Sequence, residues 1–392
     1  MHFGYLLSAT FLTCLEPWLI GARGVKNPLL KTMCNLKTDQ LIKYYGYDAE
    51  RHEVTTEDGY ILTIFRCNSK NSTQQSKPPV IVQHGILVSS DDFCISPPGQ
   101  SLAYVLADSG YDVWLANSRG NVYSRRHKTK DPNSWSGDFW NFSWLEMGIY
   151  DHPAVIDYIL YKTGHSKLYY LGHSQGTTNL LVLLSERPEY NQKIYAASLM
   201  APAVYFSHME VLTSILALVP AAVNYLESIP NTEVFPRDRL FTEDFNTFCT
   251  DNLAFCDLWL DLITGPSENQ RNETMMPIFM CHNPSGTSLR QIVHYYQTIK
   301  FGTFAKYKNG KEIPSDFELS RITAPISLHM SVSDMLTKLS DGLKLVPKLN
   351  NSEVFVHIIN GTKLNHVDFA WGMNSAKIVY SEIIKFFRKH QN

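Results

Sequence analysis

Residues 170–178 read YLGHSQGTT, in which Ser174 lies between two glycines with the spacing Gly172-x-Ser174-x-Gly176. A strand-forming run, KLYYLG, comes before this serine, and a helix-forming run, QGTTNLLVLLSER, follows it. A turn this tight strains the central residue, and the positions two residues away must lack side chains because they approach the strand and the helix closely. The stretch predicts a nucleophile elbow formed by Gly172, His173 and Gly176 around Ser174. The alternative is a polar structural turn.

Strand-length apolar runs alternate with helix-length segments on both sides of this elbow. Strands are expected at 52–67 (a hairpin turning at Asp58-Gly59), 78–86, 111–120, 167–172, 195–204, 325–334 and 352–361. Helices are expected at 100–109, 151–164, 175–187 and 375–390. This alternation predicts an α/β fold, with a mostly parallel central sheet and helices on both of its faces.

The alternation stops between residues 205 and 321. This segment contains apolar helical stretches such as MEVLTSILALVPAAVNYLESI and FCDLWLDLI, separated by Pro, Asn and Gly and without strand-type alternation. The simplest organisation is one α/β core, in two parts at 25–204 and 322–392, interrupted by a helical cap at 205–321.

The first 24 residues differ in character from the rest. FGYLLSATFLTCLEPWLIGA is apolar except for Glu16, and it is followed by small residues. This pattern is typical of a cleaved secretory signal peptide at 1–24, although only His2 stands in for the usual basic residues. Glu16 and Pro17 disfavour a membrane anchor, and a buried helix is the other alternative. We therefore expect a secreted or lysosomal protein.

Cysteines and glycosylation sequons fit an exported protein. Removal of the signal peptide leaves six cysteines, which permits up to three disulfides. Cys249 and Cys256 are the best pair because the short loop between them closes easily. Sequons compatible with a surface position occur at Asn71, Asn272, Asn350 and Asn360. A fifth sequon, at Asn141, lies in the aromatic run WSGDFWNFSW, which we expect to be packed.

The charge balance and the ligand spacings exclude some partners. The chain has 35 Lys and Arg against 37 Asp and Glu, a formal net charge of −2, and it lacks a dense basic stripe. Nucleic-acid binding is therefore not expected. The sequence has no CxxC and no Cys/His ligand spacing, so a zinc site is not expected either.

A serine hydroxyl is a good nucleophile only when a base removes its proton and a third group orients that base. In a strand–turn–helix of this kind, the acid and then the histidine should follow at the ends of later strands. Asp334 follows the run PISLHMSVS, and His366 lies in a loop before the last helix. Asp341 competes as the acid. His357 competes as the base, but it falls inside a predicted strand.

Acyl transfer also requires hydrogen-bond donors aimed at the developing oxyanion. One is expected to be the backbone N–H of Gln175, the residue after the nucleophile. The second should come from the loop after VIVQ, where HGIL (84–87) contains a glycine, and we predict the N–H of Ile86. The alternative is that HGIL is a loop with an incidental histidine.

Several blocks, in order along the chain, resemble the acid lipase family of α/β-hydrolases, which contains gastric and lysosomal acid lipases. The resemblance runs from about Leu41 to the C-terminal helix. The blocks are YGYDAERHEVTTEDGYIL, VQHGIL, LADSGYDVWLANSRGN, WLEMGIYDHPAVIDYIL, LGHSQGTT, HNPSGTS and NHVDFAWGM.

This resemblance implies an α/β-hydrolase fold with Ser174 as nucleophile, His366 as base and an oxyanion hole at Gln175 and Ile86. It also implies a lid near 235–265 and a short-loop disulfide in the cap, which favours Cys249–Cys256. The sequence departs from the family around the acid: SVSDMLTKLSD has Val332 and Ser333 where glycines are usual, and Lys338 lies where a second acidic residue is expected.

The predicted reaction is two-step hydrolysis of lipid carboxylic esters through an acyl-enzyme, without a metal or other cofactor. Apolar cap surface favours long acyl chains, because each buried methylene contributes about 0.8 kcal/mol. The expected partner is a lipid ester at a micelle, droplet or membrane surface, and no obligate protein partner is evident. The alternatives are a steryl esterase or lipophilic carboxylesterase, and a catalytically silent lipid-binding protein, which predicts damage to the serine, histidine or oxyanion motif.

Overall fold

The structure is a computed structural model that describes residues 28–69, 77–207, 229–237, 249, 252–308 and 314–391. The predicted signal peptide lies outside these residues, as do the sequon at Asn71 and most of the run MEVLTSILALVPAAVNYLESI. The structural statements that follow concern the described residues.

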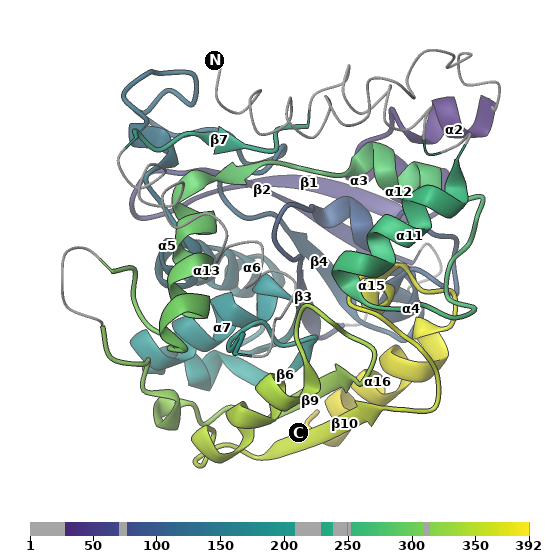
Figure 1. Ribbon diagram of the computed structural model, residues 1–392. Helices are drawn as coiled ribbons and strands as arrows, with labels where there is room; N and C mark the ends of the chain where they lie inside the picture. The colour runs from purple at the N-terminus through teal and green to yellow at the C-terminus, as the bar shows by residue number, and fades with distance from the viewer. Residues whose placement is uncertain are drawn as a thin grey trace.

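An eight-stranded sheet forms the centre of the molecule, in the order β1-β2-β4-β3-β5-β6-β9-β10 (Figure 1). Its strands are β1 (Asp48–Thr55), β2 (Ile61–Asn68), β3 (Pro79–Gln83), β4 (Asp112–Ala116), β5 (Leu168–His173), β6 (Ile194–Met200), β9 (Ile326–Ser331) and β10 (Val354–Ile359). The β1–β2 and β2–β4 pairs are antiparallel, and all other neighbours are parallel. The predicted α/β fold with a mostly parallel sheet is confirmed.

Helices cover both faces of the sheet, which explains why its inner strands β3, β4, β5, β6 and β9 are buried almost throughout. They are α4 (Leu102–Asp108) and α16 (Ser381–Lys389) on one face, and α6 (His152–Thr163) and α7 (Gln175–Glu186) on the other. Successive strand residues point to opposite faces. In β3, Val80 and Val82 therefore pack with α4 and α16, whereas Ile81 packs with α6 and α7.

The predicted cap is largely helical. Its described helices include α11 (Leu253–Thr264), α12 (Met276–His282) and α13 (Leu289–Phe301). It also contains an antiparallel pair, β7 (Glu233–Val234) with β8 (Thr287–Ser288), although no strand was expected in this region. Two residues per strand are too few to produce a visible alternation. The boundaries at 205 and 321 stay a prediction.

Two disulfides cross-link the described part of the chain. One joins Cys249 to Cys256 within the predicted cap, and the other joins Cys34 to Cys281, which ties the N-terminal part to α12. Cys67 and Cys94 are buried free thiols, so the third bridge that the cysteine count permits is not formed.

The expectation that Asn141 is packed is wrong. Phe139, Trp140 and Phe142 are buried, but the side chain between them is exposed. Its amide oxygen accepts a hydrogen bond from Asn231 Nδ2 at 3.2 Å, at the surface. The large neighbouring aromatic side chains fill the core around this turn, which directs the asparagine outward.

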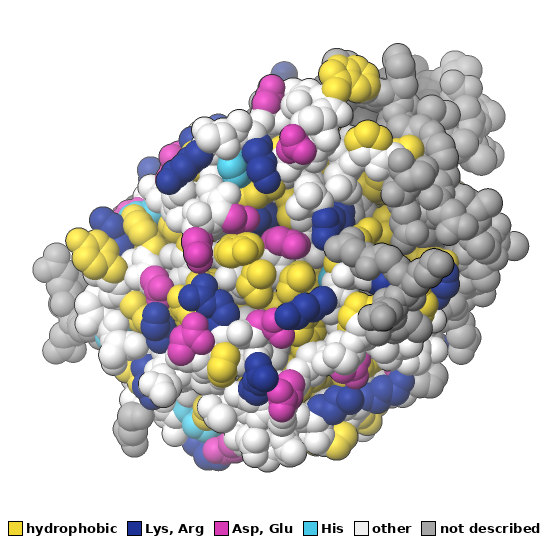
Figure 2. All heavy atoms as spheres, turned by 90° about the vertical axis from the view of Figure 1, so that its left-hand side faces the viewer, with side chains coloured by type: hydrophobic (Ala, Val, Ile, Leu, Met, Phe, Trp, Pro, Cys, Tyr) yellow, Lys and Arg dark blue, Asp and Glu magenta, His cyan; other side chains and the backbone are white. Residues whose placement is uncertain are grey.

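The other described sequons differ in exposure. Asn350 and Asn360 are exposed, and Asn272 is half-buried. On the side of the molecule shown in Figure 2, basic and acidic side chains are interspersed, so this face does not present a large field of one sign. Among the residues that the structure describes, no helix has both the length and the apolar character needed to cross a membrane.

Candidate active site

Ser174 lies directly between β5 and α7, in a strained turn. Its backbone has φ 53° and ψ −119°, outside the regions that side-chain-bearing residues normally adopt. A Cβ on Gly172 would lie 2.7 Å from the backbone carbon and oxygen of Gly176, and one on Gly176 would lie 2.5 Å from the carbonyl oxygen of Gln83. Both positions therefore require glycine.

Three polar side chains meet at the edge of the sheet where its parallel strands end. Ser174 follows β5, Asp334 follows β9 and His366 follows β10. Ser174 Oγ lies 2.8 Å from His366 Nε2, and His366 Nδ1 lies 2.9 Å from Asp334 Oδ2. A carboxylate oxygen only accepts hydrogen bonds, so Nδ1 carries the ring proton and donates a hydrogen bond to Asp334. Nε2 is then free of a proton and accepts a hydrogen bond from the serine hydroxyl. All three side chains are buried.

The competing acid and base lie in other contacts. Asp341 Oδ1 accepts a hydrogen bond from Lys344 Nζ at 2.7 Å. His357 belongs to β10, and its Nδ1 lies 3.1 Å from Nδ1 of His329. Burial lowers the pKa of His357. The histidine that reaches Ser174 is the one in the loop after this strand.

The unusual loop around Asp334 supplies its carboxylate with donors. The backbone N–H groups of Leu336 and Thr337 donate to Oδ1 at 2.9 and 2.8 Å, and the Thr337 hydroxyl donates to Oδ2 at 2.7 Å. The role of Thr337 was not predicted from the sequence. Its signal was a hydroxyl residue three positions after an aspartate, a spacing at which local side-chain hydrogen bonds are common.

The HGIL loop lies against Ser174. A Cβ on Gly85 would come within 3.0 Å of the Ser174 Cβ. The backbone N–H of Ser118 donates to Nε2 of His84, so Nδ1 of this ring carries the proton and donates to the Gly85 carbonyl at 2.7 Å. Burial lowers the pKa of His84 to about 4, which keeps the ring neutral near pH 7. His84 therefore fixes the loop that leads into Ile86, and it is not incidental.

On the other side of Ser174, Gln175 is the first residue of α7. The first N–H groups of a helix lack intrahelical partners and carry its partial positive charge. His173, the residue before the serine, donates from Nε2 to the His366 carbonyl at 2.9 Å. Burial, together with the nearby His366, lowers the pKa of His173 to about 3. The elbow therefore also holds the backbone of the loop that carries His366.

Comparisons with known proteins decide the family. The family described as "alpha/beta hydrolase fold" matches residues 78–305, and the "partial alpha/beta-hydrolase lipase region" matches residues 38–97. Lipase 1 of Drosophila melanogaster is 37% identical, over 92% of this chain and 81% of its own. Gastric triacylglycerol lipase of Mus musculus is 35% identical, over 93% and 94%. The chain belongs to the acid lipase family of α/β-hydrolases.

Solved structures support the fold of this acid lipase family member. A membrane phospholipase A has a TM-score of 0.54 at 14% identity, over 99% of both chains. An esterase from Thermogutta terrifontis has a TM-score of 0.50 at 12% identity, over 88% of this chain and all of its own. At such identities the likeness shows the fold alone.

The predicted cap of this acid lipase family member contacts both loops that carry Asp334 and His366. At the C-terminal end of α11, the Thr264 carbonyl accepts hydrogen bonds from the backbone N–H groups of Met335 and His366, at 3.3 and 3.2 Å. A Cβ on Gly265 would lie 1.9 Å from the Ser333 carbonyl oxygen. The sequence predicted an apolar helical stretch here, FCDLWLDLI, but these contacts carried no sequence signal.

Proposed function

We propose that this protein hydrolyses the carboxylic esters of lipids, with Ser174 as nucleophile, His366 as general base and Asp334 as the group that orients it. The observation that carries the proposal is the hydrogen-bonded series from Ser174 Oγ through the imidazole to the Asp334 carboxylate, at 2.8 and 2.9 Å, in a chain whose relatives are lipases. Membership of this family makes the protein a carboxylic ester hydrolase.

The reaction has two steps. His366 Nε2 takes the hydroxyl proton as Ser174 Oγ attacks the ester carbonyl, and the Asp334 carboxylate stabilises the imidazolium that forms. The imidazolium then protonates the leaving alcohol, which leaves an acyl-enzyme on Ser174. A water molecule repeats the sequence at the acyl carbonyl and releases the fatty acid.

The oxyanion of each tetrahedral intermediate accepts hydrogen bonds from the backbone N–H groups of Gln175 and Ile86. Support for this assignment comes from the start of α7 at Gln175 and from the close approach of Gly85 to Ser174. Donors held in place before the reaction stabilise the developing charge without reorganisation, and removal of one typically costs about 10²–10³ in rate.

An exposed apolar surface on α11 and the neighbouring loop supports a lipid surface as the site of action. Leu258, Leu262 and Ile263 are 67%, 51% and 50% exposed on this helix, and Val332, in the loop before Asp334, is 52% exposed. Leu258 and Leu262 lie one turn apart on the same helical face. The C-terminal end of α11 contacts the loop that carries His366, so a lipid surface that binds these apolar side chains would lie close to the proposed triad.

The relatives named gastric triacylglycerol lipase favour triacylglycerols as the preferred esters, and steryl esters are the alternative. Two disulfides and exposed sequons at Asn350 and Asn360 support passage through the oxidising secretory pathway, to the outside of the cell or to a lysosome.

The test is hydrolysis of emulsified triacylglycerols and steryl esters with matched acyl chains, by wild type and Ser174→Ala. We expect release of fatty acid by wild type, greatest from triacylglycerol, and its loss in the variant. A folded Ser174→Ala protein that keeps wild-type activity would contradict the mechanism.

A second comparison addresses the α11 surface. The double variant Leu258→Ser/Leu262→Ser should lower the ratio of emulsion to soluble-ester activity, while Tyr161→Ser, which removes an exposed aromatic on α6, should leave that ratio unchanged. An equal ratio in all three proteins would exclude α11 as a lipid-binding surface.

A further inference from the structure

The block HNPSGTS (282–288) and the start of α13 belong to the predicted cap, yet they contact the elbow and the HGIL loop. On the elbow side, the side chains of Gln175 and Gln291 form a reciprocal amide pair. Gln175 Nε2 donates to Gln291 Oε1, and Gln291 Nε2 donates to Gln175 Oε1, both at 3.0 Å. Both side chains are almost fully buried. The predicted cap thus holds the side chain of Gln175, the residue whose backbone N–H is proposed to bind the oxyanion.

The cap also holds Gln291 itself. Its Nε2 donates to Thr287 Oγ1 at 2.7 Å, and its backbone N–H donates to Ser288 Oγ at 3.1 Å. The Ser288 hydroxyl in turn donates to the Phe142 carbonyl at 2.6 Å, which anchors the start of α13 to the α/β core. Buried amides whose hydrogen bonds are all made fix a single arrangement.

The same segment holds the other side of the proposed oxyanion hole. The backbone N–H of Ser285 donates to the Leu87 carbonyl at 2.7 Å, and the Ser285 carbonyl accepts from Val122 at 2.9 Å. Leu87, the residue after Ile86, has φ 63°, a conformation that is costly for leucine and persists only where its surroundings hold it.

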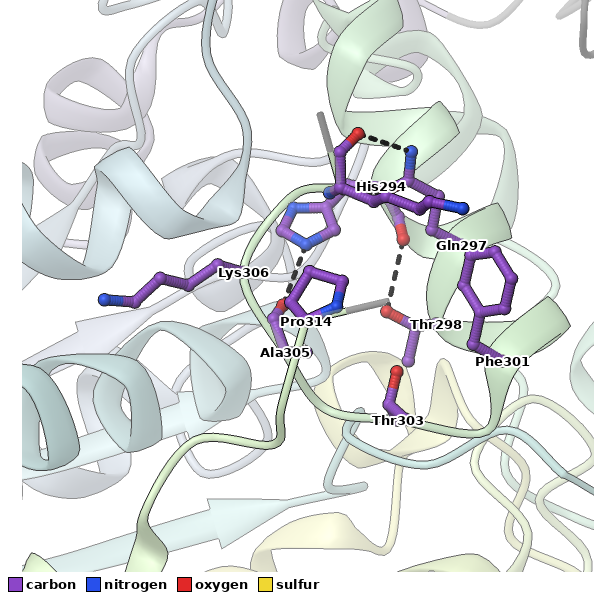
Figure 3. Close-up of a pocket in the computed structure, with 9 residues that line it drawn as sticks. His294, Gln297, Thr298, Phe301, Thr303, Ala305, Lys306 and Pro314 are labelled. Atoms are coloured by element: carbon purple, nitrogen blue, oxygen red, sulfur yellow. Dashed lines mark hydrogen bonds between the residues drawn. The ribbon is translucent and has the colours of Figure 1, made fainter. Parts of the chain in front are cut away.

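One turn further along, α13 is fixed to the core a second time. The His294 ring stacks on Trp144, with ring centroids 3.7 Å apart and planes at 12°. Its Nε2 donates to the Ala305 carbonyl at 3.0 Å, and Figure 3 shows the ring directed from α13 toward that carbonyl. These contacts fix the position of α13, the helix that carries Gln291, relative to the α/β core.

We propose that residues 285–291 brace the oxyanion hole from the cap, with Gln291 as the positioning residue for Gln175 and Ser285 as the support of the Ile86–Leu87 turn. The inference rests on the proposed function. The positions of both N–H donors, those of Gln175 and Ile86, depend on this one short segment. Catalysis therefore requires residues 285–291 to be packed against the α/β core.

The experiment compares Gln291→Leu with Gln297→Leu, another buried glutamine of α13, whose amide contacts Lys308. Turnover of a water-soluble ester is measured per titrated active site, together with KM and the unfolding midpoint. The Gln175 N–H stays in the chain but loses its support, so we expect Gln291→Leu to lower kcat about tenfold, less than the loss of a whole donor. The KM of Gln291→Leu should stay within about twofold of the wild-type KM, and Gln297→Leu should keep the wild-type kcat.

A purely structural role would lower the midpoint and the number of titratable sites, without changing kcat per site. Gln175→Leu/Gln291→Leu should be no slower than Gln175→Leu alone, because both changes break one interaction. If Gln291→Leu does not fold, Gln291→Asn replaces it in the experiment, because it keeps the amide on a shorter side chain. This variant should also lower kcat. Wild-type kcat per site in Gln291→Leu or Gln291→Asn would overturn the inference. If Ser174→Ala abolishes hydrolysis in the same assay, the proposed function survives that result.

Discussion

Substitution of Gly172 by alanine should damage the site by pure steric displacement. The added Cβ would lie 2.7 Å from the carbonyl carbon and oxygen of Gly176 and 2.9 Å from the N of Thr177, whereas ordinary contact begins at 3.4 Å. These are backbone atoms in the first turn of α7, so the turn must move by about 0.7 Å to make room. Overpacking of this kind typically costs about 1–3 kcal/mol in the free energy of unfolding.

The same displacement moves Ser174 Oγ away from His366 Nε2. A misplacement of about 1 Å costs up to about 10²-fold in rate, so we expect kcat/KM to fall by about 10- to 100-fold. Gly361→Ala is the matched control: this glycine lies in the loop that carries His366, where an added Cβ meets no atom within 4 Å and φ is not positive. Denaturant unfolding and soluble-ester hydrolysis measure both effects. Equal stability and turnover in Gly172→Ala and Gly361→Ala would refute the steric account of the elbow.

Three further perturbations test other contacts. Thr337→Val removes the hydroxyl that donates to Asp334 and should destabilise the fold by about 1–3 kcal/mol and slow turnover, while Thr337→Ser should restore both; equal behaviour of the two variants would contradict this. Burial lowers the pKa of His294 from 6.5 to about 3, so between these pH values the unfolded chain binds a proton that the native state does not. The unfolding free energy should therefore fall with falling pH, by about 1.4 kcal/mol per unit for this group, and denaturant titrations of His294→Gln should lack that part of the slope; an unchanged slope would contradict it. Cys34→Ser opens a loop of 247 residues and should cost about 2–5 kcal/mol in denaturant unfolding, more than Cys249→Ser, whose loop spans 7; the reverse order would count against the loop argument.

The sequence predicted the sheet, and it predicted that the three side chains of the proposed triad lie at one edge of it, because both depend on local patterns. Parallel strands bring their carboxyl ends to one edge, so residues that follow β5, β9 and β10 meet there however far apart they lie in the chain. Ser174 has a steric signature of its own. Asp334 and His366 have only their order and their places after strands, and the competitors Asp341 and His357 could be distinguished only by three-dimensional contacts.

The contacts that position the residues of the proposed site had no signature in the local sequence. Gln291 and Thr337 are polar residues at positions with no periodic pattern, and their roles depend on which segment lies opposite them in space. The Cys34–Cys281 bridge joins residues 247 apart, so no loop-length argument could select it. The error at Asn141 came from reading a whole aromatic run as packed, although neighbouring residues in a turn point in different directions.

The most direct measurement of the central claim is labelling by a serine-directed alkyl phosphonate, located by peptide mass spectrometry in folded wild type and in His366→Gln. We predict a single adduct on Ser174 that forms in step with the loss of ester hydrolysis, and much slower labelling of the variant, which lacks the base. Complete loss of hydrolysis with the adduct on another residue, or undiminished hydrolysis with Ser174 fully labelled, would contradict the account.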